Sequence, residues 1–327
     1  MYDKVKFWLP RIAGMGQFAP LRSKIVEADR AAFSTVDAST GEVKILFRGR
    51  LENLQITEYL AGVSVIGSLN KWANGGTNLF NMSLGETKDS LDELSEICQT
   101  NLRDIHVSAL EFGYNFEMKN DIGRYLRVLG DMPRRVRKSV SDETLYYVRK
   151  GRERDTFTLY NKVKEALRKK MPMPQDYEGK NLLRAELRLS NGIAALLKER
   201  EVSGETLTEE RFINKLINIM CEKYDSINKQ ARVNLDEIKA GGTEKEYLNL
   251  YLSILTNLIG DKFSPDEFLA ILRDKKVFSN KTQYSRLRKK FSEVISCVSL
   301  TEKDPLLEEL NAKFEDLKDM AKNQTPK

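Results

Sequence analysis

The stretch NLLRAELRL at residues 181–189 decides the fold, because its side chains alternate between apolar and polar. Successive side chains of a β-strand point to opposite faces of a sheet, so this stretch predicts a strand with one buried face. Leu183 and Leu187 lie on the buried face. The opposite face carries the charged residues Arg184, Glu186 and Arg188.

Two upstream segments, 106–116 and 155–163, repeat this alternation. In the first, Glu111 lies opposite a row of aromatic and apolar residues. In the second, Phe157, Leu159 and Val163 form the apolar face, and the opposite face carries Thr158, Tyr160 and Lys162. If the three strands are neighbours, one sheet face presents two carboxylates, a tyrosine, a lysine and two arginines.

Two interpretations of this face remain open. The pattern alone favours a half-buried antiparallel sheet whose outer face is simply charged. The residue types, however, are those that transfer a phosphodiester to a tyrosine: Glu111 and Glu186 would hold a divalent cation, and Tyr160 would attack the phosphate. A free tyrosine has a pKa of roughly 10 and needs activation, for which Lys162 is the candidate.

The composition restricts the chemistry further. The 327 residues contain one histidine, His106, which excludes zinc fingers, sites built on several imidazoles and most histidine-based triads. A metal site would therefore consist mainly of oxygen ligands, which favours Mg²⁺ or Mn²⁺. Three widely spaced cysteines, the lack of an apolar leader and the lack of a membrane-spanning run predict a cytoplasmic protein without a membrane partner.

Positive charge is concentrated around the tyrosine strand. Residues 119–170 contain 16 Lys and Arg against 7 Asp and Glu, although the whole chain has a net charge of only +6. Such clusters suit a surface that follows a phosphate backbone, although a plainly solvated loop is the alternative. The predicted DNA contacts are Arg134, Arg135, Arg137, Lys138, Arg149, Lys150, Arg152, Arg154, Arg184 and Arg188.

We predict an α+β domain over residues 1–200, in which an antiparallel sheet has helices on one face and leaves its polar face open for DNA. A helix over 90–102 is expected to begin with Ser90 and Glu93 as a capping box. Residues 201–327 predict an all-α domain, with helices at 209–228, 244–259 and 305–320. A helix pair within 264–291 is compatible with helix-turn-helix DNA binding, or equally with a basic solvated face.

Five stretches together resemble a known family. They are YDKVKFWLP (2–10), VIGSLNKWANGGTNLF (65–80), ALEFGYNF (109–116), RERDTFTLYNKVKE (152–165) and NLLRAELRL (181–189). In order and spacing they resemble the filamentous-phage gene II and gene X replication initiators and the related phage and plasmid replication proteins. Glu111 stands where that family more usually has an aspartate.

The resemblance implies rolling-circle initiation in a bacterial host: one strand of an origin is nicked, a 5′-phosphotyrosine forms, and polymerase extends the free 3′-hydroxyl. Tyr160 matches the nucleophile and Glu186 the carboxylate of the Arg-x-Glu strand, with Tyr146 and Tyr147 as rival nucleophiles. DNA and a host helicase or polymerase are the implied partners. Two alternatives remain: a mobilisation relaxase with the same chemistry, and a DNA-binding replication regulator without catalysis.

Overall fold

The computed structural model describes residues 1–11, 19–25, 30–140, 143–149, 155–229, 265–275, 277, 280–296 and 304–323. The chain divides into two compact units. The first comprises Met1–Leu126, Asp131–Ser226 and Ala312–Lys327, and the second comprises Arg127–Gly130 and Ile227–Asn311. The expected domain boundary at residue 200 stays a prediction.

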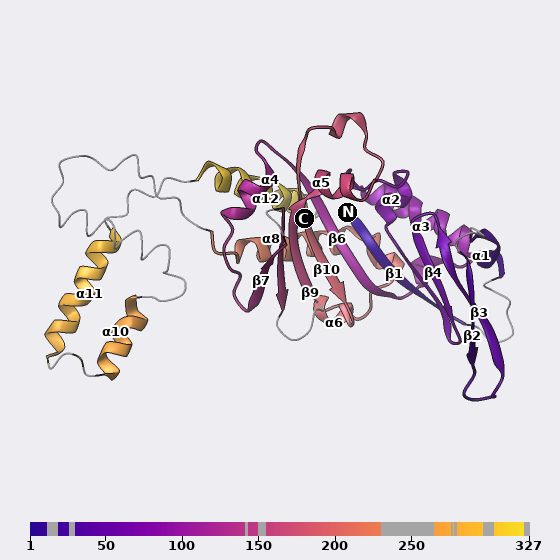
Figure 1. Cartoon of the computed structure of the whole chain (residues 1–327), viewed down its shortest axis with the longest axis horizontal. Helices are drawn as coiled ribbons and strands as arrows, with labels where there is room; N and C mark the ends of the chain where they lie inside the picture. The colour runs from indigo at the N-terminus through magenta and orange to yellow at the C-terminus, as the bar shows by residue number, and fades with distance from the viewer. Residues whose placement is uncertain are drawn as a thin grey trace. The chain divides into compact units, whose positions relative to one another are not determined.

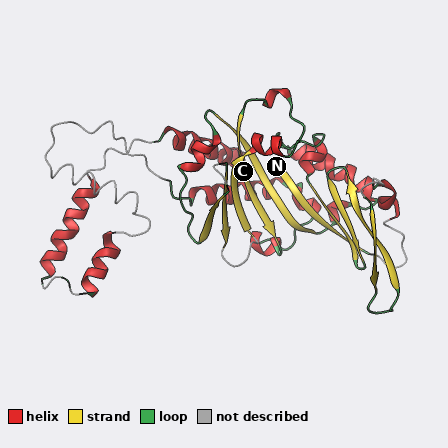
Figure 2. Cartoon of the chain, viewed as in Figure 1, coloured by secondary structure: helices red, strands yellow, loops and turns green. Residues whose placement is uncertain are grey.

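The first unit is built on one antiparallel sheet with the strand order β2-β3-β4-β5-β1-β6-β10-β9-β8-β7 (Figures 1 and 2). The central strands β6, β10 and β9 follow one another near the middle of this order, so the three alternating segments are neighbours, as expected. The strands are β1 (Tyr2–Pro10), β2 (Ala31–Val36), β3 (Val43–Leu51), β4 (Leu54–Tyr59), β5 (Gly62–Gly67), β6 (Val107–Met118), β7 (Arg135–Ser139), β8 (Thr144–Arg149), β9 (Asp155–Asn161) and β10 (Asn181–Ser190).

The helices complete an α+β fold followed by a helical C-terminal region, which confirms the predicted fold class. Those before the C-terminal region are α1 (Ala19–Lys24), α2 (Leu69–Ala73), α3 (Leu84–Cys98), α4 (Ile122–Arg127), α5 (Lys162–Arg168), α6 (Ile193–Leu197) and α7 (Gly204–Leu207). The C-terminal helices are α8 (Glu210–Asp225), α10 (Pro265–Asp274), α11 (Lys281–Ser296) and α12 (Pro305–Asn323).

The apolar face of the central strands carries the core of the first unit. Leu183 of β10 lies opposite Phe116 of β6, and both side chains are buried. The Phe116 ring contacts Phe314 of α12 with 4.9 Å between the ring centroids, and Phe314 stacks on Tyr224 of α8 at 3.8 Å. Helices α8 and α12 therefore meet over this face, where burial of aromatic rings provides much of the stabilisation.

The start of α3 differs from the expectation. Residues 83–93 contain the Ser-x-x-Glu pattern twice, and the helix uses the upstream copy, with Ser83 as the cap and Glu86 as its partner. Ser90 is instead buried within the helix. The prediction of a start at Ser90 was wrong because either serine can cap, and the longer helix satisfies more backbone hydrogen bonds.

The tyrosine strand is also shorter than expected. It ends at Asn161, whose side chain accepts a hydrogen bond from the Lys164 backbone N–H and so caps α5. Val163 therefore belongs to a helix, where it packs with Ala166 and Leu182. Leu182 lies on the same face of β10 as Arg184, so α5 flanks the polar face of the sheet.

The second unit contains the helix pair expected at residues 264–291, as α10 and α11. The Asn280 side chain accepts a hydrogen bond from the Thr282 backbone N–H at the start of α11. The Tyr284 hydroxyl donates to the Leu272 carbonyl oxygen at 3.1 Å, and Phe268 contacts Phe291 edge to face. These contacts join the two helices into a hairpin with Arg286 to Lys290 largely on its exposed side.

Two further expectations have different outcomes. The helix expected at 209–228 is confirmed as α8, whereas the one expected at 244–259 lies outside the described residues. Among the helices that the structure describes, none combines the length and apolar character that crossing a membrane requires.

We predict that Phe314→Ala destabilises the first unit by about 3–5 kcal/mol, because it removes a buried ring that joins α8 to the sheet. Urea unfolding measures the change. The control is Asp316→Ala, an exposed residue of the same helix, which should change the free energy of unfolding by less than about 0.5 kcal/mol. Equal effects of the two substitutions would contradict this packing.

Candidate active site

Strand register brings the predicted polar residues together on one face. Glu186 of β10 lies between Gly113 of β6 and Thr158 of β9. Arg184 lies opposite Tyr160, and Arg188 lies opposite Glu111. Residues that are far apart in sequence thus share one surface.

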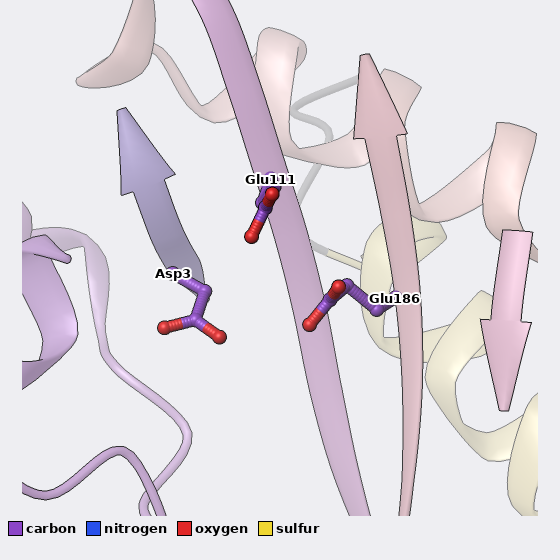
Figure 3. A group of neighbouring side chains, drawn as sticks. All are labelled: Asp3, Glu111 and Glu186. Carbon is purple, nitrogen blue, oxygen red and sulfur yellow. The ribbon is translucent and has the colours of Figure 1, made fainter. Parts of the chain in front are cut away.

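Three carboxylates form the centre of this surface: Asp3 of β1, Glu111 of β6 and Glu186 of β10 (Figure 3). Each contributes an oxygen, and these oxygens all lie within 4.8 Å of one another. Such spacing allows one cation to bind all three carboxylates. The sequence predicted Glu111 and Glu186 as ligands, but it did not predict Asp3.

Asp3 reaches the site because β1 is irregular at its start. Tyr2 pairs with Phe112 and Lys4 pairs with Glu111, so three residues of β1 oppose two of β6. A bulge of this kind changes the direction of a side chain. Asp3 and Lys4 therefore both lie on the carboxylate face, although strict alternation assigns Asp3 to the apolar face with Val5.

Arg184 holds two of the three carboxylates in place. Its side chain is 0% exposed; Nη2 lies 3.1 Å from Asp3 Oδ2, and Nε donates to Glu186 Oε2 at 3.3 Å. A third contact runs from Nη1 to Asn115 Oδ1 at 2.9 Å. The sequence grouped Arg184 with the DNA contacts, but its burial directs the guanidinium to the carboxylates instead.

The environment shifts the pKa values of two of the carboxylates, Asp3 and Glu111, in opposite directions. Burial raises the pKa of Asp3, but Arg184, Lys162 and hydrogen bonds from Asn78 and Ser68 outweigh it, so the pKa is well below its usual range. Burial, followed by the nearby Glu186, raises the pKa of Glu111 despite the opposing effect of Arg188. Concentrated negative charge of this kind favours a bound cation.

The Tyr160 side chain is directed into the carboxylate group. Its hydroxyl donates a hydrogen bond to Glu186 Oε2 at 3.1 Å, and the residue is 8% exposed. Burial and then the Glu186 charge raise the pKa of Tyr160 well above 10. Ionisation of this phenol therefore requires added positive charge nearby.

Lys162 supplies part of that charge. Its Nζ lies 5.7 Å from the centroid of the Tyr160 ring and donates to Glu165 Oε2 at 2.6 Å. Burial and then Arg184 lower the pKa of Lys162 to about 8. The two residues predicted to act together, Tyr160 and Lys162, are therefore neighbours, although Lys162 belongs to α5.

A cavity of about 290 Å³ lies beside Tyr160, and we call it the tyrosine cavity. Tyr146 of β8 lines this cavity together with Glu111, Glu186 and Arg188. Tyr147, the other rival nucleophile, points to the apolar face, where it is fully buried and stacked on Phe157. The structure thus separates the two rivals: only Tyr146 of this pair has access to the carboxylates.

The predicted DNA contacts have different environments. Arg134, Arg137, Lys138 and Arg149 are exposed, which suits such contacts. Arg135 instead forms an ion pair with Asp155, which also binds Lys223. Lys150, Arg152 and Arg154 lie outside the described residues.

Arg188 and His106 are the remaining predicted or candidate residues. The Arg188 side chain is 51% exposed and contacts Glu111 Oε1 at 2.7 Å, so it lies at the opening of the carboxylate group. The His106 ring lies 3.8 Å from Glu201 and is not part of the carboxylate group.

We predict that Gly113→Ala disrupts the site, because a Cβ at this position would lie only 2.7 Å from Arg184 Nε. Overpacking of this kind typically costs about 1–3 kcal/mol, which thermal and urea unfolding would detect. Gly85→Ala is the control, since a Cβ there meets nothing closer than 3.9 Å. A Gly113→Ala protein as stable as the control variant would show that Arg184 does not depend on this glycine.

Comparison with known protein families identifies the family of the chain. The family model for the N-terminal part of the phage gene II replication-associated protein matches residues 1–207, which include every strand of the sheet. No curated protein matches the chain. Because the match extends over more than half of its length, the chain belongs to the gene II family of phage replication-associated proteins.

Proposed function

We propose that the chain initiates rolling-circle replication by nicking one strand of an origin, with Tyr160 as the nucleophile. The observation that carries the proposal is the hydrogen bond from Tyr160 to Glu186, within a group of three carboxylates. Membership of a phage replication family supports an action on DNA. The phenolic oxygen would bond to the scissile phosphorus, and the bond from phosphorus to the 3′ oxygen would break.

The carboxylate group fits a divalent cation. Three buried or half-buried carboxylates provide an all-oxygen donor set, which suits Mg²⁺ or Mn²⁺ better than Zn²⁺. A cation held by Asp3, Glu111 and Glu186 would neutralise charge on the phosphate and favour ionisation of the neighbouring phenol. Under the alternative interpretation, the carboxylates only neutralise Arg184 and Arg188.

The protein side chains have distinct proposed roles. Glu186 accepts the hydrogen bond of Tyr160 and orients the hydroxyl, while Lys162 stabilises the phenolate by its positive charge. Arg184, buried on the same face, positions Asp3 and Glu186. Arg188, at the opening of the site, is placed to contact the phosphate oxygens, as are the exposed cations of β7 and β8.

We expect Mn²⁺ to bind the carboxylate group, as measured by calorimetry or by the spin-resonance signal of the free ion. Asp3→Asn should weaken this binding by more than about 10-fold, because it removes a ligand charge. Glu117→Gln removes an exposed carboxylate of the same sheet outside the site and is the control. Unchanged Mn²⁺ affinity in Asp3→Asn would mean that the carboxylates serve the arginines alone.

We expect the protein to convert supercoiled DNA that carries its own gene and flanks into nicked circles, in the presence of Mg²⁺ or Mn²⁺. Tyr160→Phe should reduce the rate by roughly 10³-fold or more, because it removes the attacking oxygen. Tyr146→Phe, on the same face, should retain nicking. Activity lost in Tyr146→Phe and kept in Tyr160→Phe would assign the attack to Tyr146.

The same assay separates the remaining alternatives. A regulator without catalysis would bind this DNA and leave it intact with or without a chelator. A mobilisation relaxase would nick a transfer origin by the same chemistry, so the position of the nick within the tested DNA identifies the biological role.

A further inference from the structure

A second cavity, of about 650 Å³, continues from the carboxylates across β1, β5, β4 and β3. Arg48 and Arg50 line it, and we call it the arginine cavity. It shares Asp3, Glu111, Glu165, Lys169 and Arg188 with the tyrosine cavity, so the two adjoin at the carboxylate group and α5. None of the DNA contacts predicted from sequence lines the arginine cavity except Arg188.

The arginine cavity is rich in cations. Besides the two arginines of β3, it is lined by Lys4 of β1 and Lys71 of α2, and by the polar side chains of Asn53 and Gln55. Arg48 and Arg50 are exposed. Within the described part of the chain, Arg48, Arg50 and Lys71 form no ion pair, so their charges are available to an anionic partner.

An aromatic pair lies farther along the same sheet face. Trp8 of β1 and Tyr59 of β4 have ring centroids 5.7 Å apart. In β1, Trp8 is two residues from Lys6 and four from Lys4, so it shares their face. In β4, Tyr59 shares the face of Gln55. Both rings therefore lie on the carboxylate side of the sheet. Tyr59 is 45% exposed, so part of its ring is open to solvent.

Cations followed by partly exposed aromatic rings are features that bind single-stranded nucleic acid. The cations contact the phosphate backbone, and the rings stack on bases. A duplex keeps its bases stacked inside, so only an unpaired strand offers faces to Trp8 and Tyr59. From Lys4 to Trp8 the strand extends roughly 13 Å at about 3.3 Å per residue, which is enough for several nucleotides.

The sheet order gives the bound nucleic-acid strand a direction. The tyrosines are on β8 and β9, the carboxylates on β10, β6 and β1, and the arginine cavity on the far side of the carboxylates. In phosphoryl transfer the attacking and leaving oxygens lie in line on opposite sides of phosphorus. With a tyrosine attacking from one side, the leaving 3′ oxygen faces the arginine cavity.

We propose that the arginine cavity, together with Trp8 and Tyr59, binds the single-stranded segment on the 5′ side of the nick. This segment ends in the 3′-hydroxyl after cleavage. The proposal rests on the nicking function for its direction, while the binding of single strands does not depend on it. The 3′ end thus stays beside the carboxylates, in position for extension or for the reverse transfer.

Binding is tested without metal or cleavage. The chain has two tryptophans, so the full-length Trp72→Phe protein reports on Trp8 alone. We expect oligo(dT) to quench its fluorescence in EDTA. In anisotropy titrations, Tyr59→Ala should weaken binding about 5- to 150-fold, the range for loss of one stacked base. Duplex of the same length should compete poorly.

Salt dependence tests the cations. In a plot of log affinity against log salt concentration, we expect Arg50→Ala to reduce the steepness of the slope by about 0.7. The double variant Arg48→Ala with Arg50→Ala should reduce it by about 1.4. The control is Lys88→Ala, which removes the same charge at an exposed position of α3 outside the cavity and should leave the slope unchanged. Equal slopes in wild type and the double variant would overturn the cavity as a strand-binding surface.

Direction is tested once the nick has been mapped. Single strands carrying 5-iododeoxyuridine a few nucleotides to the 5′ or the 3′ side of the nick are photo-crosslinked to the Tyr160→Phe protein. Mass spectrometry then identifies the attached residue. We expect Trp8 or Tyr59 from the 5′-side probes only, and attachment from the 3′-side probes would overturn the direction. If the protein makes no nick, the proposed function is wrong. The binding measurements in EDTA still test whether the arginine cavity binds single strands.

Discussion

The buried guanidinium of Arg184 is the interaction on which the site depends. It lies on the carboxylate face of the sheet, is fully buried, and contacts Asp3 of β1, Glu186 of its own strand and Asn115 of β6. A buried cation is stable only when paired, and buried carboxylates have the same requirement. Arg184 therefore makes a group of acidic residues compatible with the interior, and Gly113 provides the space for it.

This arrangement explains why the polar face remains chemically useful. The apolar face of β6, β10 and β9 packs against α8 and α12 and fixes the strands. The other face then carries the carboxylates, with Tyr160 on one side and the arginine cavity on the other. The rigid sheet holds the acidic group and the tyrosine at fixed separations, which a loop would not do as well.

Much of the centre follows from sequence, because strand alternation assigns Glu111, Tyr160 and Glu186 to the polar faces of their strands. The pairing of β6, β10 and β9 then brings these faces together. Asp3 does not follow, since a bulge in β1 reverses the direction that alternation gives it. The role of Arg184 also depends on how completely its side chain is buried, which the alternation of a strand does not indicate. Arg48 and Arg50 reach the site only through the pairing of β3, β4, β5 and β1, a long-range consequence of topology.

The central claim is that Tyr160 attacks a phosphodiester beside the three carboxylates. The most direct measurement is to nick DNA with the wild-type protein and Mn²⁺, digest the denatured complex with protease and nuclease, and locate the modified residue by mass spectrometry. The account predicts a nucleotide joined through its 5′ phosphate to the Tyr160 peptide. A nucleotide on the Tyr146 peptide, or nicked DNA with no attached protein, would contradict it.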